Sequence, residues 1–432
     1  MINKTLNNIF KGDKVIWMVF FFLCIISVVE VYSASSQLTY KGGSYLAPVM
    51  KHIGILVLGI FCMVVTLNVK CKYFKIVTPF LLIISVVMLL WALIGGDKTN
   101  EAARWVGFGF LKFQPSEIAK GTLVLATAQI LSAMQTEKGA DRHAFNFILI
   151  ICAFIIPLIL VENFSTAALL CIVVFMMMIL GRVPMQQLGK LLGIVVLAVV
   201  FMISMIWMLG DDQKKTNPDQ TLVQQIDEKS TDQMLVEQID GEQVAAAEKK
   251  ESSFEKVFHR FGTWKARITD FLNNEEVPPE KVDLVGKGAQ KNNATMAIAA
   301  SNVLGKGPGN STQRDFLSQA FSDFIYAIII EEMGILGAIF VALLYIILLF
   351  RTGRISNRCE NNFPAFLAMG IALLLVTQAL FNMCVAVGLA PVTGQPLPLI
   401  SKGGTSTIIN CVYIGVILSI SRSAKRKLEV VS

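Results

Sequence analysis

The stretch 322–350, SDFIYAIIIEEMGILGAIFVALLYIILLF, decides the fold class of this chain. Apart from three acidic residues it is apolar over more than the ~20 residues that cross a bilayer. Asp323 opens the apolar run, and Glu331 and Glu332 lie inside it. Charged groups within a membrane segment are costly and usually serve a function, so the stretch predicts both a membrane-spanning helix and a polar site.

The whole sequence has the composition of an integral membrane protein. Of its 432 residues, 54% are hydrophobic and only 16% are charged. A soluble domain of this length would need more polar residues to cover its surface. The first apolar run lacks a small-residue cleavage pattern, so we interpret it as a retained helix and not as a signal peptide.

Ten apolar runs have the length of a membrane-crossing helix. They cover residues 15–34, 49–69, 73–95, 115–134, 144–161, 164–181, 187–209, 323–350, 363–390 and 405–421. The expected fold is an all-α integral membrane protein, a polytopic bundle of about ten transmembrane helices with one large extracytoplasmic loop. It would comprise an N-terminal membrane half (1–209), the loop (210–322), a C-terminal membrane part (323–421) and a basic cytoplasmic tail (422–432).

Basic residues are concentrated in every second short connection. They are Lys4, Lys11, Lys14, Lys70, Lys72, Lys75, Lys138, Arg142, Arg182, Lys190, Arg351, Arg354, Arg358, Arg422, Lys425, Arg426 and Lys427. Because short loops rich in Lys and Arg stay in the cytoplasm, we expect both termini on the cytoplasmic side of the inner membrane. The net charge of +7 is then mainly a topology signal. The basic residues form no single stripe, so no nucleic-acid partner is expected.

The large loop changes character along its length. Residues 210–250 are polar, mixed in charge and nearly free of aromatics, which predicts a flexible insert. Residues 254–272 carry phenylalanines at helical spacing beside basic residues. This second segment is typical of a helix lying in the lipid headgroup layer, or of one packed on the outer face of the protein itself.

Cysteine and histidine usage predicts neither a disulfide nor a metal site. The eight cysteines fall in predicted spans or, for Cys71 and Cys359, in cytoplasmic loops, where oxidation to disulfides is disfavoured. The three histidines are widely separated, so no cluster at metal-ligand spacing exists.

The segment 104–120, RWVGFGFLKFQPSEIAK, leads into the fourth predicted helix. Pro115 suits the first helical turn, and Glu117 and Lys120 lie one turn apart on one face. An ordinary interfacial Trp with a surface ion pair would produce the same pattern. However, both charges already lie within an apolar run, which favours a polar cavity.

Two further segments on the outer side are rich in glycine. In 300–324, the glycines at 305, 307 and 309 do not form a phosphate loop, because no Gly-Lys-Ser/Thr opens a helix; we expect a turn that brings the backbone close to another surface. The segment 390–410, APVTGQPLPLISKGGTSTIIN, is irregular at membrane depth, so it must be buried in protein or line an aqueous cavity. Ser401 and Lys402 are adjacent and do not form a Ser-x-x-Lys nucleophile motif.

Four ordered motifs carry a specific resemblance. RWVGFGFLKFQPSEIAK, GKGPGNS, SDFIYAIIIEEMG and PVTGQPLPLISKGGTS resemble the signatures of the shape, elongation, division and sporulation (SEDS) family, whose members include RodA and FtsW. The resemblance covers nearly all the chain outside 210–250. It implies a membrane glycosyltransferase that polymerises lipid II into glycan strands outside the cytoplasmic membrane. It also implies a class B penicillin-binding protein as transpeptidase partner, together with other membrane proteins of the division or elongation complex.

The resemblance also assigns roles to residues. The essential acid of the family matches Asp323, expected as general base, and its Glu and Lys match Glu117 and Lys120 as further catalytic residues. Substrate-binding candidates are Arg104, Gln114, Lys306, Arg314, Ser401, Lys402, Gly403 and Gly404. Structural candidates are Pro115, Glu331, Glu332, Gln378, Asn382 and Pro391. A pyrophosphate leaving group needs positive charge or a metal, so a divalent cation (Mg²⁺ or Mn²⁺) is the one cofactor left open.

The sequence departs from the family pattern at two places. LSQAFSD stands where Leu-Pro-Glu and His-Thr usually precede the catalytic Asp, which puts the hydrogen bonding of Asp323 in question. VENFSTA replaces the usual Pro-Asp-x-Gly-Thr, with Asn163 and Ser165 in place of Asp and Gly. A lipid II flippase and a non-catalytic scaffold are the rival functions. Within the family, the C-terminal motif and basic tail favour an FtsW-type division enzyme at the septum over a RodA-like elongation enzyme.

Overall fold

The computed structural model describes residues 11–35, 46–95, 97–99, 102–108, 111–137, 139–209, 269, 271, 289–317 and 322–430. The chain divides into two compact units, Met1–Leu191 with Glu276–Ser432, and Leu192–Glu275. The predicted insert at 210–250 and nearly all of the predicted amphipathic segment lie outside the described residues. The candidate site lies in the first unit.

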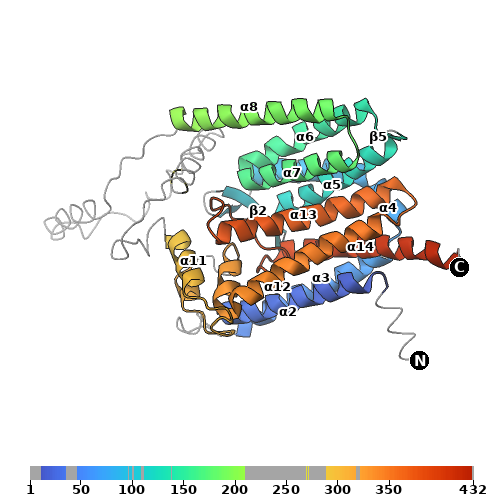
Figure 1. Ribbon diagram of the computed structural model, residues 1–432. Coiled ribbons are helices and arrows are strands. Elements are labelled where there is room, and N and C mark those ends of the chain that lie inside the picture. Colours follow the sequence, from blue (N-terminus) through green and yellow to red (C-terminus); the bar gives the residue numbers. More distant parts are fainter. Residues whose placement is uncertain are drawn as a thin grey trace, which may run out of the picture. The chain divides into compact units, whose positions relative to one another are not determined.

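Ten helices occupy the positions that the apolar runs predict (Figure 1). They are α2 (Lys14–Ser35), α3 (Leu46–Asn68), α4 (Cys71–Gly95), α5 (Pro115–Ala133), α6 (Arg142–Glu162), α7 (Phe164–Leu180), α8 (Met185–Leu209), α12 (Ile325–Ser356), α13 (Asn362–Ala386) and α14 (Thr405–Val430). Within the described residues, seven helices are long and apolar enough to cross a membrane. The helical membrane-protein class is therefore confirmed, whereas the count of ten spans is not.

Three predicted spans fall outside those seven for separate reasons. α7 is an apolar helix of only 17 residues. In α8, the part whose side chains are described as a continuous apolar helix, Met185–Leu197, is also shorter than a membrane span. α5 carries Glu117 and Lys120 together with several hydroxyl residues, which lowers its average hydropathy. Charge on a helix that packs inside a bundle is compatible with a membrane, because neighbouring helices cover it.

Short strands and two short helices lie between the long helices. β1 (Asp97–Thr99), β2 (Ala102–Phe108) and β3 (Leu111–Phe113) form an antiparallel sheet just before α5. β4 (Gln135–Thr136) pairs with β5 (Gly139–Ala140) after it, and α11 (Ala289–Ala299) and η3 (Gln313–Asp315) precede α12. These strands were not expected from the sequence, because each is too short for an alternation of polar and apolar residues to stand out beside the helical pattern.

Helix α13 is the centre of the first unit. It packs against α5 and α7 on one side and against α12 and α14 on the other (Figure 1). α14 lies along α3, and α2 packs between α3 and α12. The inner face of α13 is almost wholly apolar, but Gln378 and Asn382 are buried there, each 1% exposed. Buried amides require hydrogen-bond partners, so these two residues mark a polar layer inside the bundle.

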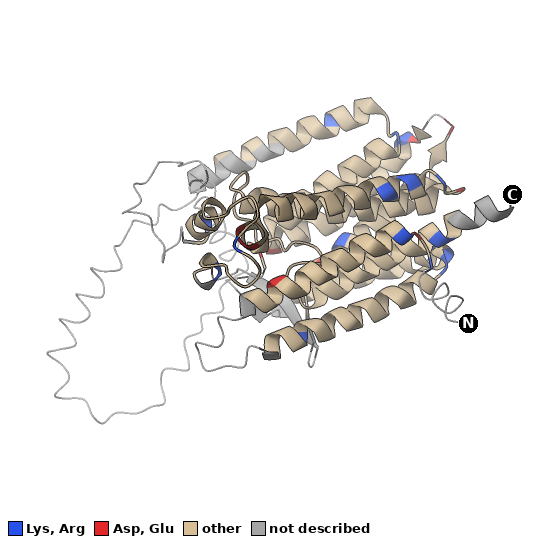
Figure 2. Cartoon of the chain, turned by 60° about the horizontal axis from the view of Figure 1, so that its bottom comes forward, with Lys and Arg blue, Asp and Glu red and all other residues tan. Residues whose placement is uncertain are grey.

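Basic residues gather at the end of the first unit where α2 begins and α3 ends, as Figure 2 shows. At that end Arg351 of α12 forms a salt bridge to Asp13 before α2, with 2.8 Å between Nη2 and Oδ2. Arg422 of α14 donates to Oδ1 of Asn68 at the end of α3 over 3.3 Å. The bias of charge along the sequence is thus also a bias in space.

The helix that carries the acidic motif is broken. The sequence predicts one helix over 323–350, but α12 begins at Ile325 and Gly334 interrupts it with φ 69° and ψ −173°. A Cβ on Gly305, whose φ is +75°, would lie 2.3 Å from the carbonyl oxygen of Glu332. The loop before α12 thus touches the helix backbone at the break, the close approach that the glycine pattern predicts.

Candidate functional site

Asp323 lies in the turn that leads into α12, and its side chain is half-buried. Ser322 donates its hydroxyl to Oδ1 of Asp323 over 2.7 Å. A Cβ built on Gly394, a residue with φ +68°, would lie 3.5 Å from Oδ2. The carboxylate therefore sits in van der Waals range of the backbone of the loop 387–404, at a glycine whose positive φ disfavours other residues.

The loop 387–404 between α13 and α14 is held from several helices. Ser27 of α2 donates to the carbonyl of Ile400 over 2.7 Å, and Tyr345 of α12 donates to the carbonyl of Pro398. Gln395 donates its amide to Thr166 of α7 over 2.6 Å. The irregular backbone predicted here at membrane depth is thus satisfied by protein groups, as a non-aqueous environment requires.

The two buried amides of α13 bond to the same loop. Gln378 Nε2 donates to the carbonyl of Pro396 over 3.0 Å. Asn382 Nδ2 donates to the carbonyls of Gln395 at 2.7 Å and Asp323 at 2.9 Å. Gln378 and Asn382 are one helical turn apart, so their side chains lie on one face. Asn382 therefore links the loop to the main chain of the candidate catalytic residue.

Glu117 and Lys120 form an ion pair that is closed to solvent. Lys120 Nζ lies 2.8 Å from Glu117 Oε1, and the two residues are 0% and 3% exposed. Lys120 also donates to Gln378 Oε1 over 2.8 Å. Tyr413 of α14 donates to the main-chain carbonyl of Glu117 over 2.7 Å. The sequence predicts catalytic roles for this pair, and these roles stay a prediction; the structure shows the pair buried and bonded to Gln378.

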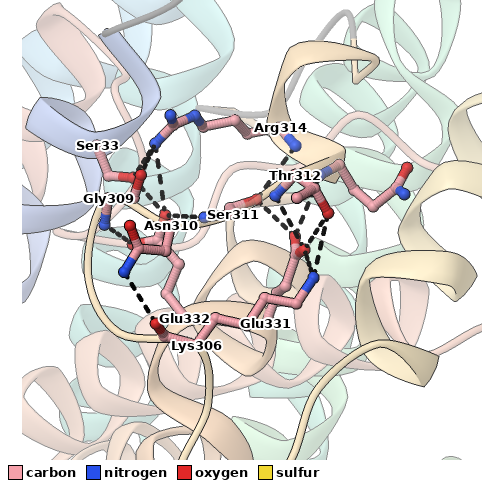
Figure 3. Close-up of polar contacts among 10 residues, drawn as sticks. Ser33, Lys306, Gly309, Asn310, Ser311, Thr312, Arg314, Glu331 and Glu332 are labelled. Carbon is pink, nitrogen blue, oxygen red and sulfur yellow. Dashed lines mark hydrogen bonds and ion pairs between the residues drawn. The ribbon is translucent and has the colours of Figure 1, made fainter.

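Glu331 is enclosed by the segment that precedes α12 (Figure 3). Lys306 Nζ lies 2.6 Å from Oε1, and Thr312 donates to the same oxygen from its amide at 3.0 Å and its hydroxyl at 2.9 Å. The hydroxyl of Ser311 donates to Oε2 over 2.5 Å. A carboxylate with this many donors is held in one position by its own chain.

Glu332 is enclosed in the same way. The amide of Gly309 donates to Oε2 over 3.0 Å, and Ser33 of α2 donates its hydroxyl to Oε1. Arg314 lies 3.8 Å from Oε1 and donates to Ser33 Oγ over 2.9 Å and to the carbonyl of Gly309 over 2.8 Å. We use the name acidic clamp for the residues Ser33, Lys306, Gly309, Ser311, Thr312, Arg314, Glu331 and Glu332 (Figure 3).

Two predicted substrate-binding residues, Lys306 and Arg314, belong to the acidic clamp. The sequence predicts Lys306 and Arg314 as cations for a pyrophosphate. In the structure Lys306 is paired with Glu331 and Arg314 with Glu332. Pairing reduces the positive charge available to an anionic ligand. Their contact with substrate stays a prediction, and so does the structural role of the two glutamates.

The other predicted site residues divide between the loop and the entrance to α5. Ser401, 3% exposed, donates to the carbonyl of Ser322 over 2.6 Å, and it also accepts from the amide of Leu397 at 2.7 Å. Gly404 has φ +55°, and Gly403 lies against Ser406 at the start of α14. Burial lowers the pKa of Lys402, and the nearby Lys51 lowers it further. Ser401 thus holds the turn that carries Asp323.

Four more predicted residues lie at the start of α5, in β2 and after α13. α5 begins at Pro115, as the sequence predicts, with Gln114 as its N-cap. Pro391 lies half-buried after α13. Arg104 belongs to β2, and its side chain is outside the described part of the chain. Sequence reasoning missed Ser33, Ser311, Thr312 and Gln395, because isolated hydroxyl and amide residues carry no periodic signal.

A divalent cation would find few protein ligands in the described residues. They contain no group of three or more His, Cys, Asp and Glu side chains that could hold a metal ion. Asp323 can offer one carboxylate, so the oxygens of a pyrophosphate would have to supply most of the coordination. The described residues therefore do not form a complete binding site for such an ion.

Known proteins are similar to this chain in sequence. The sequence profile of the FtsW/RodA/SpoVE cell cycle proteins matches residues 13–216 and 254–426. The chain belongs to this family. A probable peptidoglycan glycosyltransferase FtsW of Geobacter metallireducens is 28% identical over 429 residues, which is 97% of either chain. The peptidoglycan glycosyltransferase MrdB of Escherichia coli is 24% identical and covers 96% of this chain and 94% of its own.

Solved structures of family members share the fold. A chain of a peptidoglycan synthase complex that coordinates polymerization and crosslinking superposes with a TM-score of 0.67 at 21% identity, over 96% of this chain and 98% of that one. RodA of Thermus thermophilus gives a TM-score of 0.60 at 19% identity, over 95% and 97%. At these identities the likeness establishes the fold alone, whereas the match to the family profile confirms the resemblance drawn from the four motifs.

Within the described residues, one position of each departure from the family pattern has a structural explanation. Ser322 bonds to Asp323 Oδ1, so the unusual residue before the aspartate still supplies a hydrogen bond. Asn163 is the N-cap of α7 and accepts from the amides of Ser165 at 3.1 Å and Thr166 at 3.3 Å. Asp and Asn cap helices about equally well, so the Asn here preserves the helix start.

Proposed function

We propose that this chain is a peptidoglycan glycosyltransferase that polymerises lipid II into glycan strands. The observation that carries the proposal is a half-buried carboxylate, Asp323, held beside the loop 387–404 in a family whose relatives bear that activity in their names. The chain covers 97% and 94% of the length of two such relatives.

Asp323 is the general base of the proposed reaction. Joining two sugars requires that an acceptor hydroxyl lose its proton as its oxygen attacks the anomeric carbon of the donor. The proton goes to the carboxylate, the new glycosidic bond forms, and the bond from the anomeric carbon to the lipid pyrophosphate breaks. Undecaprenyl pyrophosphate leaves with the bonding electrons. Ser322, by its hydrogen bond to Oδ1, orients the carboxylate.

The leaving pyrophosphate requires positive charge nearby. Lys402 stands next to Ser401, which bonds to the residue before Asp323. It is therefore a candidate for this role, and Lys306 and Arg314, which are paired within the clamp, are others. Burial lowers the pKa of Lys402, and an anion beside it would favour its protonated form.

The cellular setting follows from the same reasoning. Glycan strands are assembled outside the cytoplasmic membrane, so Asp323 must face outward and both termini must lie in the cytoplasm. A class B penicillin-binding protein is the expected partner, since the synthase complex with the same fold coordinates polymerization with crosslinking. Several relatives carry the name FtsW, which supports division at the septum over elongation, the branch that bears the name MrdB.

Orientation can be tested with single cysteines in a background that lacks the native ones. A cysteine at Leu304, which is 78% exposed, should react with an impermeant maleimide in cells stripped of any outer barrier. One at Asn357, exposed at the opposite end of α12, should react only after permeabilisation. The reverse pattern would invert the topology and remove Asp323 from its substrate.

Polymerisation itself separates the proposed enzyme from its rivals. Purified protein in detergent, alone and with its transpeptidase partner, is incubated with lipid II and the products are separated by size. Glycan polymer is the expected result. Transfer of lipid II across vesicles without polymer would identify a flippase, which intramembrane carboxylates also suit. Neither activity, with partner binding retained, would identify a scaffold.

A further inference from the structure

The buried ion pair has a described path to the catalytic loop. Lys120 donates to Gln378 Oε1 over 2.8 Å, and Gln378 Nε2 donates to the carbonyl of Pro396 over 3.0 Å. Lys120 is in turn held by Glu117 at 2.8 Å. One amide side chain thus joins α5 to a loop residue that lies far from it in the sequence.

Lysine is a donor and never an acceptor, which fixes the amide. With Nζ of Lys120 at one end, Gln378 must turn its oxygen towards α5 and its nitrogen towards Pro396. Without the ammonium, Gln378 Oε1 loses its donor and the amide is held only by the Pro396 carbonyl. Lys120 therefore fixes Gln378 from the α5 side, and through Gln378 it limits how far the loop can move.

The loop passes this orientation on to the catalytic turn. Asn382, one turn along α13, bonds to the carbonyls of Gln395 and Asp323, and Ser401 bonds to the carbonyl of Ser322. The main chain on both sides of the Ser322–Asp323 peptide is thereby tied to the loop segment 395–401. A shift of this segment would move the carboxylate relative to its substrate.

We propose that Glu117, Lys120 and Gln378 form a positioning unit that sets the place of Asp323 through the loop 395–401. The pair is 3% and 0% exposed, so it acts on the base through the protein and not by contact with substrate. This inference rests on the proposed function. It replaces a direct catalytic role for Glu117 and Lys120 with an indirect one, and it gives Gln378 a part in the reaction.

The decisive variant replaces both charges at once. Removing one partner would leave an unpaired buried charge and endanger folding, whereas replacing a buried ion pair by apolar residues is often neutral or stabilising. The double variant Glu117→Leu/Lys120→Met should therefore fold, but its Gln378 amide is no longer fixed. We expect kcat for polymerisation to fall about 10²-fold, the scale expected for misplacement of a catalytic group by about 1 Å, with KM unchanged.

Gln378→Glu gives an independent measurement. The carboxylate keeps an acceptor for Lys120 but removes the donor to Pro396, so it too should lower kcat while KM stays near the wild-type value. Thr127→Val is the matched control. Thr127 is a buried residue of α5 whose hydroxyl bonds only within its own helix, to Leu123, in the described residues. Its activity should match that of the wild type.

The measurements are initial polymerisation rates against lipid II concentration, with the melting temperature of each purified variant. Low kcat at unchanged melting temperature and KM supports the positioning unit. Wild-type kcat in the folded double variant would overturn it and leave the pair a purely structural element. A raised KM at unchanged kcat would also overturn it, in favour of direct substrate contact. A wild-type protein that makes no polymer would instead refute the proposed function.

Discussion

The two acidic regions at the start of α12 have opposite surroundings. Glu331 and Glu332 are 0% exposed, and their oxygens accept from lysine, hydroxyl and main-chain donors of the clamp. Asp323 is half-buried beside a glycine of the loop 387–404. A carboxylate surrounded by donors of its own chain is fixed and inaccessible, whereas one at an edge can reach a substrate. Proximity in the sequence therefore does not imply a shared role.

The largest expected effect is at Asp323. Asp323→Asn preserves the shape of the side chain but removes its capacity to accept a proton, so the polymerisation rate should fall by roughly 10²- to 10⁴-fold. Protein abundance and partner binding should be unchanged. The assay is glycan polymerisation from lipid II by the purified variant.

Glu331→Gln is the matched comparison for that experiment, because it makes the same chemical change in the clamp. It should be much milder. Near-normal polymer from the Asp323→Asn protein would refute the proposed base. An equally inactive but well-folded Glu331→Gln protein would indicate that the base lies in the clamp, and that Glu331 and Asp323 do not differ in role.

The second effect concerns stability and tests whether the clamp is rigid. A Cβ on Gly305 would meet the main chain of Glu332 and Gly334 at 2.3 and 2.4 Å. Gly305→Ala should lower the free energy of unfolding by about 3 kcal/mol, since backbone atoms must shift and the positive φ is strained. The readout is the thermal unfolding midpoint of the purified protein.

Gly309→Ala is the control in the same loop. Gly309 also has a positive φ, +89°, but nothing lies within 4 Å of the position of its Cβ. It should therefore show only the conformational strain. Equal losses in the two variants would mean that the contact between the loop and the break in α12 does not hold the clamp together.

Lys306→Met tests which of two roles this cation has. Lys306 is paired to Glu331, and its side chain is 27% exposed. Its loss would leave the buried Glu331 carboxylate with one hydrogen-bond donor fewer, so the free energy of unfolding should fall by about 1–3 kcal/mol. KM for lipid II should stay the same. A raised KM at normal stability would instead return Lys306 to the substrate-binding group.

The smallest effect is expected at Glu30 of α2, near the clamp. It is 0% exposed, and in the described part of the chain neither of its carboxyl oxygens has a hydrogen-bond partner. A buried polar group without a partner costs free energy, so Glu30→Leu should leave stability equal or raise it by about 1 kcal/mol, with normal polymerisation. Lower activity at full stability would give Glu30 a role that its surroundings do not suggest.

Sequence alone determined the features that depend on local composition. The apolar runs placed the ten helices to within a few residues at most ends, because a bilayer requires long uninterrupted hydrophobic segments and their pattern is local. The four ordered motifs identified the family, and they pointed to Asp323 and to the glycines of the loop before α12. Each of these signals is contained within a short stretch of chain.

Only the tertiary structure decided which polar and charged side chains contact one another. Lys120 and Gln378 are 258 positions apart, and Ser33 and Glu332 are 299 apart. Hydropathy cannot encode such pairs, because they depend on which helix faces pack together. The pairing of Lys306 and Arg314 with the clamp, and the burial of Glu117 with Lys120, therefore emerged from packing. In a bundle surrounded by lipid, a buried polar group can bond only within the protein, and the fold determines which partner, if any, is within reach.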